Sequence, residues 1–534
     1  MKRINILSIT PSAFLFGVLA LTVSCTKDFE NINTNKNAVA TIGPAQLPFL
    51  LSQAQSAAPN SQWNYQVAQN LFADQYAQYF ACEATYFGSD RLVINQNWVG
   101  AAFNPMYNTV APQLQSIFAA TDPTSAEYQI ANIWWVYTFH RVTDYWGPIP
   151  YFNIGQSGTS VAYDSQDKIY YDFFDRLNTA VTTLNNHTSE TPYGSYDLVY
   201  GGNVGNWIKF ANSLRLRLAL RISNVDPARA KTEAEAAVAG GVMTASPGDD
   251  ALVQRSVKGS DGNGLAIMEW NEFRMSAAME SVLKGYKDPR IAEYYMPSTV
   301  TGDYEGLRNG LTSAQLTDPS GLNAAAYNSH HGKRWSPPDY VAGVAPNTVT
   351  GVPTYLETSQ NIMCTAESYF NRAEGALKGW NMGGTAQTLY ETGIKNSFLQ
   401  WGIAADPASY ITSLNVPIAP NDFLNSPPMT NIPVAFGATQ AVQEEQIATQ
   451  KWIAMFPEGM EAWADYRRSK KVKLYPVANS DNPLITNTST QWLRRIPFLT
   501  SEKQSNAAGV QTGYTILSGQ ANDTEMTPLW WDKN

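Results

Sequence analysis

The sequence contains little cysteine, little histidine and little charge. Of its 534 residues, three are Cys and four are His, and charged side chains make up 15%, well below the roughly one quarter that is usual in globular chains. Four histidines leave few places for imidazole catalysis. The net charge of −9 offers no basic face for phosphate groups, so we expect no nucleic-acid partner.

Familiar catalytic motifs are also missing. The sequence contains no G-x-S-x-G, G-x-x-x-x-G-K-[ST], G-x-G-x-x-G, H-E-x-x-H or C-x-x-C pattern, which are the short motifs of nucleophile elbows, nucleotide sites, zinc sites and redox sites. His140 and Asp144 lie one helical turn apart, the spacing of an acid/base or metal pair, but also of an interior histidine bonded within its helix. His330 and His331 would point to opposite sides of an extended chain, which disfavours chelation by both.

Only the N-terminus contains a long apolar segment. The basic start Met1-Lys2-Arg3 is followed by an apolar run from Ala13 to Leu21, shorter than the roughly 20 residues of a membrane span. Leu21-Thr22-Val23-Ser24-Cys25 resembles the lipobox of bacterial lipoproteins, although Thr22 departs from the usual Leu or Val. We predict a signal peptide over 1–24, lipidation of Cys25 and a flexible, polar tether over 25–40. An ordinary secretory signal with an incidental Cys is the alternative.

Two cysteines remain once Cys25 carries the lipid. Cys82 and Cys364 lie in apolar, helical-looking sequence, where buried free thiols are common. We expect two free thiols, with a disulfide in an oxidising compartment as the alternative.

Aromatic residues are abundant, and helical periodicity dominates the chain. The 15 Trp, 28 Tyr and 21 Phe provide ample material for a large core, and the apolar spacing from Asn361 to Trp380 is that of one buried helical stripe. The segment from Val204 to Ser223 is apolar on more than one face, which predicts a buried helix. We expect further helices at about 65–83, 109–120, 126–145, 166–186, 227–239, 272–286, 386–400 and 440–455. The fold class is therefore mainly α with little β.

Two long segments do not follow a helical pattern. Residues 296–356 and 403–438 are rich in Gly, Pro, Asn and Ser, and long irregular insertions in a compact domain are often functional. No clean 34-residue repeat is present, although small residues at packing positions such as Ala366 and Ala373 are compatible with degenerate tetratricopeptide units. We expect a single domain over 41–534 with loop-rich insertions near these two segments.

Aromatic rings beside amide and hydroxyl side chains are typical of sugar sites. The C–H face of a sugar stacks on a ring, while its hydroxyl groups bond to Asn, Asp and Arg. Rings that pack in the core or anchor a loop are the alternative at each position. On this argument the candidate ligand residues are Tyr86, Phe87, Arg91, Asn97 and Trp98 in the first segment, and Trp335 and Tyr340 in the Pro-rich insertion.

Carboxylates give weaker signals. Glu367 and Glu374 lie seven residues apart on one helix face, where salt bridges to buried arginines are the natural interpretation. Asp261-Gly262-Asn263-Gly264 resembles half a calcium loop but lacks the full motif, so a plain turn is favoured over structural calcium. We expect no cofactor.

Several segments together resemble the SusD/RagB family of outer-membrane nutrient-binding lipoproteins, in its SusD-like subgroup, over nearly the whole chain. They are the stretch from Cys25 to Asn33, Trp146-Gly147-Pro148-Ile149-Pro150-Tyr151, the stretch from Trp207 to Arg217, Lys287-Asp288-Pro289-Arg290, the stretch from Ala366 to Gly375, and the stretch from Gln450 to Arg468.

The resemblance implies a tetratricopeptide-like scaffold, anchored by lipid on the outer membrane and facing outward. It implies a nutrient-binding protein rather than an enzyme, acting as a lid on a SusC-like TonB-dependent barrel transporter and passing oligosaccharide into it. A peptide-binding lid is one alternative. A surface glycoside hydrolase is another, because its two carboxylates need no sequence motif.

Overall fold

Consecutive α-helices make up most of the part of the chain that the structure describes. The computed structural model describes residues 42–156, 160–336 and 354–533, and the residues from Leu47 onward form one unit. Its α-helices are α3 (Leu47–Ala57), α4 (Gln96–Val99), α5 (Ala111–Ala120), α6 (Ala126–Trp146), α7 (Gln166–Leu184), α8 (Val204–Arg221), α9 (Pro227–Ala239), α10 (Ala277–Tyr286), α11 (Ile291–Tyr294), α12 (Ser313–Leu316), α13 (Thr365–Leu377), α14 (Ala386–Trp401), α15 (Pro407–Ile411), α16 (Gln440–Ala454), α17 (Gly459–Ser469), α18 (Thr500–Ser505) and α19 (Ala507–Ile516).

Short strands and tighter or wider helical turns complete this unit. The strands are β1 (Phe80–Cys82), β2 (Ala251–Val253), β3 (Phe273–Met275) and β4 (Gln360–Met363). The π-helical segments are η1 (Gln66–Asp74), η4 (Met106–Val110) and η6 (Asn263–Glu269), and the 3₁₀ turns are η2 (Ser89–Arg91), η3 (Gly100–Ala102), η5 (Gly194–Tyr196), η7 (Lys333–Trp335), η8 (Thr354–Glu357) and η9 (Gln520–Asn522).

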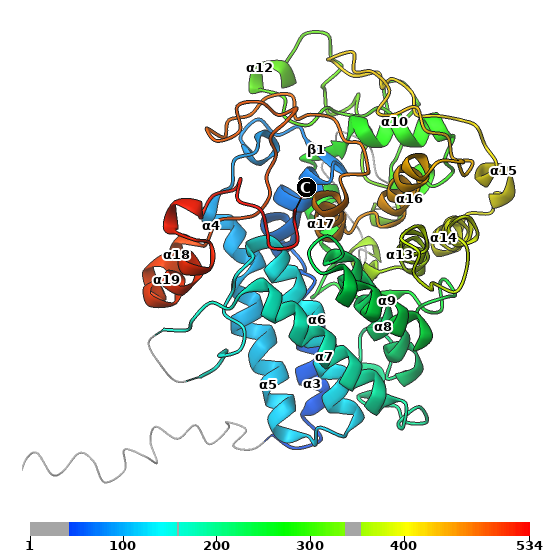
Figure 1. The fold of residues 1–534 in the computed structure, drawn as a ribbon. Coiled ribbons are helices and arrows are strands. Elements are labelled where there is room, and N and C mark those ends of the chain that lie inside the picture. The colour runs from blue at the N-terminus through cyan, green and yellow to red at the C-terminus, as the bar shows by residue number, and fades with distance from the viewer. Residues whose placement is uncertain (1–41, 157–159, 337–353, 534) are drawn as a thin grey trace, which may run out of the picture. The chain divides into compact units, whose positions relative to one another are not determined.

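The helices pack mainly against their neighbours in the sequence. Helix α6 packs on α7, α7 on α8 and α8 on α9, while α13 packs on both α14 and α16 and also on α8. Figure 1 shows α6 and α7 next to α8 and α9 below the centre, with α13, α14 and α16 above α8 and α9 toward the right. This mainly α architecture of stacked helix pairs is the predicted tetratricopeptide-like scaffold.

Local signals determine several helix ends. Ser125 caps α6 by accepting a hydrogen bond from the Tyr128 N–H, and Asp226 caps α9 with Pro227 in the first turn. Both arrangements satisfy backbone donors that a helix start leaves unpaired. The predicted helices 126–145 and 227–239 are accordingly confirmed within one residue.

Buried ion pairs join helices that are far apart in the sequence. Arg217 of α8 bonds to Glu367 of α13 at 2.6 Å, and Arg221 of α8 bonds to Glu461 of α17 at 2.5 Å. All four side chains are buried. Glu374, the other acid predicted to be structural, pairs with Arg468 at 2.6 Å. The salt-bridge interpretation of both glutamates is confirmed.

Three predicted helices were wrong over part of their length. The segment 65–83 is the π-helical η1 followed by β1, and 272–286 begins with β3 before α10 starts. The first four residues of the helix predicted at 361–380 belong largely to β4, which pairs with β2. In each case a strand partner more than 100 residues away provides hydrogen bonds that local periodicity cannot reveal.

Other elements were missed or lie in the irregular segments. Helix α17 has no counterpart among the predicted helices. The described part of 296–356 contains α12 and short turns, and 403–438 contains only α15 as a helix. Cys82 and Cys364 are both buried and free, as expected. Within the described ranges, no helix combines the length and the apolar character that crossing a membrane requires.

Candidate ligand-binding face

Pairing of β1 with β3 brings two distant surface segments together. Cys82 lies opposite Phe273, and the Glu83 N–H continues the pairing by donating to the Glu272 carbonyl at 3.0 Å. The chain after β1 then turns outward at Tyr86. The Tyr86 hydroxyl donates a hydrogen bond to one Glu272 carboxylate oxygen.

A third segment meets the same carboxylate. Gln66, at the start of η1, donates from Nε2 to the other Glu272 oxygen at 2.6 Å. Trp63 lies three residues before Gln66, and Trp270 lies two residues before Glu272. Trp63, Tyr86 and Trp270 are 58%, 68% and 40% exposed. We call Trp63, Tyr86 and Trp270, together with Gln66 and Glu272, the ring face.

A strained turn holds the Trp270–Glu272 segment. Asn271 has a φ of 59°, in the left-handed region, which non-glycine residues adopt at a cost unless their side chains are held. Its Oδ1 accepts from Arg274 Nη2 at 3.0 Å and lies 2.9 Å from His330 Nε2. Arg274 also pairs with Glu83 at 3.1 Å. These contacts give His330 a structural role behind the ring face.

The Tyr86 hydroxyl remains a donor over the physiological pH range. Desolvation raises the pKa of Tyr86, and the hydrogen bond to Glu272 and its charge raise this pKa further. The carboxylate has about four lone-pair positions, and Tyr86 and Gln66 occupy one on each oxygen. Glu272 therefore retains capacity to accept hydrogen bonds from a ligand.

Two of the predicted ligand residues adjoin Tyr86 or support it. Phe87 is buried, with its ring centroid 4.7 Å from that of Tyr86, 5.5 Å from that of Trp98 and 6.1 Å from that of Phe273. Trp98 is half-buried. Phe87 therefore serves as a base for the ring face, and Trp98 presents part of its surface beside it.

Arg91 and Asn97 make contacts that hold the structure together. Arg91 Nε bonds to Asp481 at 2.6 Å, and its Nη1 donates to the Leu311 carbonyl at 3.3 Å. The Asn97 N–H is bonded to the Asn95 side chain, which caps α4, while the Asn97 side chain is exposed. Of the two, only Asn97 presents its polar group to solvent.

Trp335 is not a surface ring. It is 3% exposed and packs against His331, Trp401 and Phe456. Its ring therefore belongs to the core and is not presented to a ligand, contrary to the prediction. Tyr340, like Cys25, lies outside the described residues. Sequence reasoning missed Trp63 and Trp270, although both have the predicted composition, with rings among Asn, Gln, Ser and Glu.

The other residues singled out for chemistry have structural partners. His140 lies with Nδ1 3.2 Å from the Val136 carbonyl, and Asp144 accepts from Tyr170 at 2.5 Å. Asp261 accepts from Asn263. The described residues contain no group of three or more His, Cys, Asp or Glu side chains placed to hold a metal ion.

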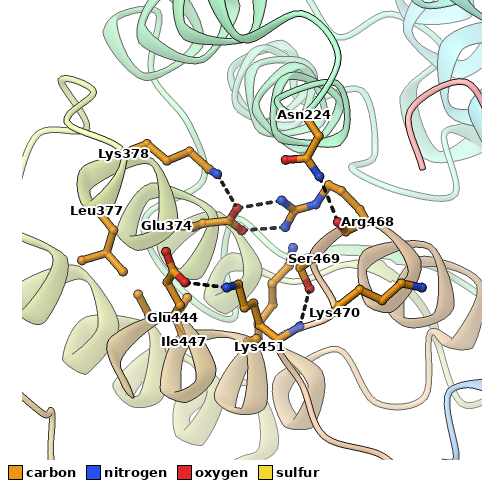
Figure 2. Close-up of a pocket in the computed structure, with 12 residues that line it drawn as sticks. Asn224, Glu374, Leu377, Lys378, Glu444, Ile447, Lys451, Arg468, Ser469 and Lys470 are labelled. Atoms are coloured by element: carbon orange, nitrogen blue, oxygen red, sulfur yellow. Dashed lines mark hydrogen bonds and ion pairs between the residues drawn. The ribbon is translucent and has the colours of Figure 1, made fainter. Parts of the chain in front are cut away.

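A charged cavity of about 390 Å³ lies elsewhere, between α13, α16 and the end of α17. Some of its charges are paired with one another: Glu374 binds Arg468, and Glu444 binds Lys471 at 2.7 Å. Figure 2 shows these pairs, with Lys470 extending away from them. We call this the paired-charge cavity. The described residues that line it include two glutamates and five basic residues, so the lining is basic overall.

Comparison with known proteins agrees with this architecture. A model of the SusD-like family, described as SusD and RagB outer membrane lipoproteins, matches residues 30–532. The chain belongs to this family. The family resemblance inferred from the sequence is thereby confirmed.

Solved structures of SusD homologues match over nearly their whole lengths. A chitin-binding SusD homologue from Flavobacterium johnsoniae is 37% identical with a TM-score of 0.80, covering 91% of this chain and 98% of that one. A SusD homologue from Bacteroides uniformis is 31% identical with a TM-score of 0.80, covering 91% and 99%. One from Bacteroides thetaiotaomicron is 28% identical with a TM-score of 0.80, covering 91% and 99%. Comparison with curated proteins gives no match.

Proposed function

We propose that this SusD/RagB family member is a surface lipoprotein that captures oligosaccharide on the ring face and delivers it, as a lid, to a SusC-like TonB-dependent transporter. The observation that carries the proposal is that three exposed rings lie on segments whose side chains meet at Glu272. Membership of an outer-membrane lipoprotein family supports the location, with Cys25 as the lipid attachment.

The chemistry of the ring face suits a neutral sugar chain. Aromatic faces stack on the apolar side of a pyranose ring, and Glu272, Gln66 and Tyr86 provide acceptors and donors for its hydroxyl and amide groups. A few stacked rings with a few hydrogen bonds, after the ordering costs of binding, leave micromolar to millimolar affinity. Weak capture of this kind suits a protein that must hand its ligand on.

Chitin fragments are the first ligands to test. The Flavobacterium johnsoniae homologue binds chitin and is 37% identical over 91% of this chain. Linear oligomers of N-acetylglucosamine combine pyranose faces, for the exposed rings, with acetamido groups, which hydrogen-bond to carboxylate and amide side chains.

Calorimetric titration of the full-length protein with chitohexaose tests the proposal, with cellohexaose and an extended peptide as comparison ligands. We expect saturable binding without product release, and at least about tenfold weaker binding in Tyr86→Ala and Trp270→Ala. Tyr196→Ala is the matched control, because Tyr196 is 44% exposed and packs on Phe49 of α3, a helix that Figure 1 shows far from β1. Peptide binding without glycan binding would favour the peptide-binding lid instead.

The lid function has a separate test. Purification of the full-length lipoprotein from native outer membranes should bring along a large β-barrel protein in a stable ratio. Sugar binding by protein that never associates with such a barrel would support capture and contradict delivery.

A further inference from the structure

Two segments that carry the ring face are joined to each other by buried polar groups. Tyr65 lies directly before Gln66 at the start of η1, and Asn263 begins η6, which ends directly before Trp270. The Tyr65 hydroxyl lies 2.7 Å from Oδ2 of Asp74, the last residue of η1, and 3.2 Å from Oδ1 of Asn263. All three interacting side chains are buried. We call Asp74, Tyr65 and Asn263 the tyrosine bridge.

The tyrosine bridge is one hydrogen short when Asp74 is ionised. A phenol has a single hydroxyl hydrogen, and here it faces two acceptor oxygens. The Asn263 amide is oriented by Asp261, because Asn263 Nδ2 donates to Asp261 Oδ1 at 3.4 Å and its oxygen is thereby turned to Tyr65. A proton on Asp74 Oδ2 supplies the missing hydrogen, since Asp74 then donates to Tyr65 and Tyr65 donates to Asn263.

The Asp74 carboxylate lies in an environment that disfavours its charge. Asp74 is 0% exposed, and Arg141 of α6 reaches it only through Gln69, whose Oε1 accepts from Arg141 and whose Nε2 donates to Asp74, each at 3.0 Å. Gly459, the first residue of α17, lies so close that a Cβ there would overlap the carboxylate. Burial raises the pKa of Asp74 to about 7, although the hydrogen bonds from Tyr65 and Gln69 lower it.

Charged and titratable groups from several elements surround the tyrosine bridge. The carboxylate of Glu458, before α17, repels Asp74 and raises its pKa, while Glu458 itself pairs with Arg141 at 3.8 Å. Asp261, before η6, adds a second carboxylate near Tyr65, and burial raises its pKa to about 6. The other titratable groups are tyrosines whose pKa burial raises and which stay neutral, namely Tyr65, Tyr79, Tyr145 and Tyr295. These surroundings favour a proton on Asp74.

We propose that Asp74 is a protonation site that regulates the ring face, with capture strongest when the proton is bound. The inference rests on the proposed function, which assigns oligosaccharide to the ring face. With the proton, the tyrosine bridge holds η1 to η6 and thereby Gln66 to Glu272. Without it, Asn263 Oδ1 loses its donor to the carboxylate, and an uncompensated charge lies buried between the two segments, which is costly. Separation of η1 from η6 relieves that cost and loosens the ring face.

Fluorine NMR of the full-length protein labelled with fluorotryptophan tests the proposal without any ligand. Trp63→Phe and Trp270→Phe assign the two tryptophan signals of the ring face. In the wild type, both signals should shift as the pH rises from about 5 to 9, with a midpoint near pH 7. Asp74→Asn places an amide N–H where the protonated carboxyl donates to Tyr65, so both signals should keep their low-pH positions throughout.

Two further variants keep the test decisive. Asp90→Asn is the matched control, because Asp90 is another buried aspartate, bonded by the Cys82 and Gly310 backbone N–H groups; it should retain the transition near pH 7. Tyr65→Phe removes a hydrogen bond that lowers the pKa of Asp74, so the midpoint should move to higher pH even if Asp74→Asn fails to fold. Absence of a transition near pH 7 in the wild type would overturn the proposal, as would the same transition in Asp74→Asn.

Calorimetry with chitohexaose at about pH 6 and pH 8 separates regulation from capture. The wild type should bind at least about threefold more weakly at the higher pH, whereas Asp74→Asn should bind equally at both. Equal affinities of the wild type at the two pH values would contradict regulation. If no oligosaccharide binds at either pH, the proposed function fails, and the fluorine titration alone decides whether Asp74 is the protonation site.

Discussion

The indole of Trp335 lies flat on the imidazole of His331, with 4.0 Å between ring centroids and 8° between the ring planes. Phe456 meets both rings edge-on, at 5.8 Å and 6.2 Å. Burial lowers the pKa of His331 to about 3, so the imidazole in this stack is neutral at physiological pH. The stack joins the Pro-rich insertion to the end of α16 and belongs to the core.

Trp335→Ala should therefore destabilise the protein rather than alter its ligand site. Truncating a buried Trp costs about 3–5 kcal/mol, which urea unfolding measures as a lower midpoint. The affinity for chitohexaose per folded molecule should be unchanged. A large loss of affinity for chitohexaose at wild-type stability would show that Trp335 takes part in ligand binding.

Glu272 should contribute to oligosaccharide affinity both directly and by holding Tyr86. Replacing it with Ala removes the acceptor for Tyr86 and Gln66, and we expect roughly three- to tenfold weaker binding, the equivalent of about one hydrogen bond. Glu190→Ala is the control, since Glu190 is an exposed glutamate whose carboxylate pairs with His187. Equal affinities of the two variants in calorimetry would show that Glu272 does not act in binding.

The Arg217–Glu367 pair should stabilise the contact between α8 and α13. Because both side chains are buried, replacing Glu367 alone with Leu leaves the Arg217 guanidinium with the more distant Glu461, at 3.6 Å, and should cost up to about 3 kcal/mol. Adding Arg217→Met should restore much of that loss, since no unpaired charge then remains between the two positions. Urea titrations of both single variants and the double variant measure the coupling, and strictly additive losses would contradict it.

Lys470 should make stability depend on pH above neutrality. Burial lowers its pKa to about 7, and its Nζ lies 4.2 Å from the Trp492 ring centroid. An unfolded lysine has a pKa of about 10.4, so between about pH 7 and 10 the unfolded state binds the additional proton and stability rises with pH. Lys470→Met removes this proton exchange.

The free energy of unfolding of the wild type relative to Lys470→Met should thus increase from pH 7 to pH 9, by up to about 1.4 kcal/mol per pH unit. Urea unfolding of both proteins at each pH measures the difference. Parallel pH profiles would show that Lys470 titrates normally in the folded protein.

Cys25→Ala should release the protein from the membrane. With acyl chains as the only predicted anchor, their removal eliminates stable bilayer attachment. Fractionation should move the variant from the membrane to the soluble fraction, with its melting temperature unchanged. Retention in the membrane fraction after a salt wash would contradict lipid anchoring at Cys25.

The sequence by itself determined the class of scaffold. Caps such as Ser125 and Asp226, and apolar spacing along 126–145 and 227–239, depend on neighbours within one or two helical turns. The family was predicted from motifs such as the stretch from Trp207 to Arg217. In the fold, Arg217 of this stretch donates a hydrogen bond to Glu367. These features depend on residues that are close together in the sequence, so they can be predicted without the tertiary structure.

Only the tertiary structure decided which rings meet solvent. Tyr86 and Trp335 have similar polar, turn-like sequence surroundings, yet one is 68% exposed and the other 3%. The difference arises because Trp335 is covered by Trp401 and Phe456, which are distant in the chain, whereas β1–β3 pairing directs Tyr86 outward toward Glu272. Burial of a ring in an irregular segment depends on packing against remote segments, which the sequence around that ring does not encode.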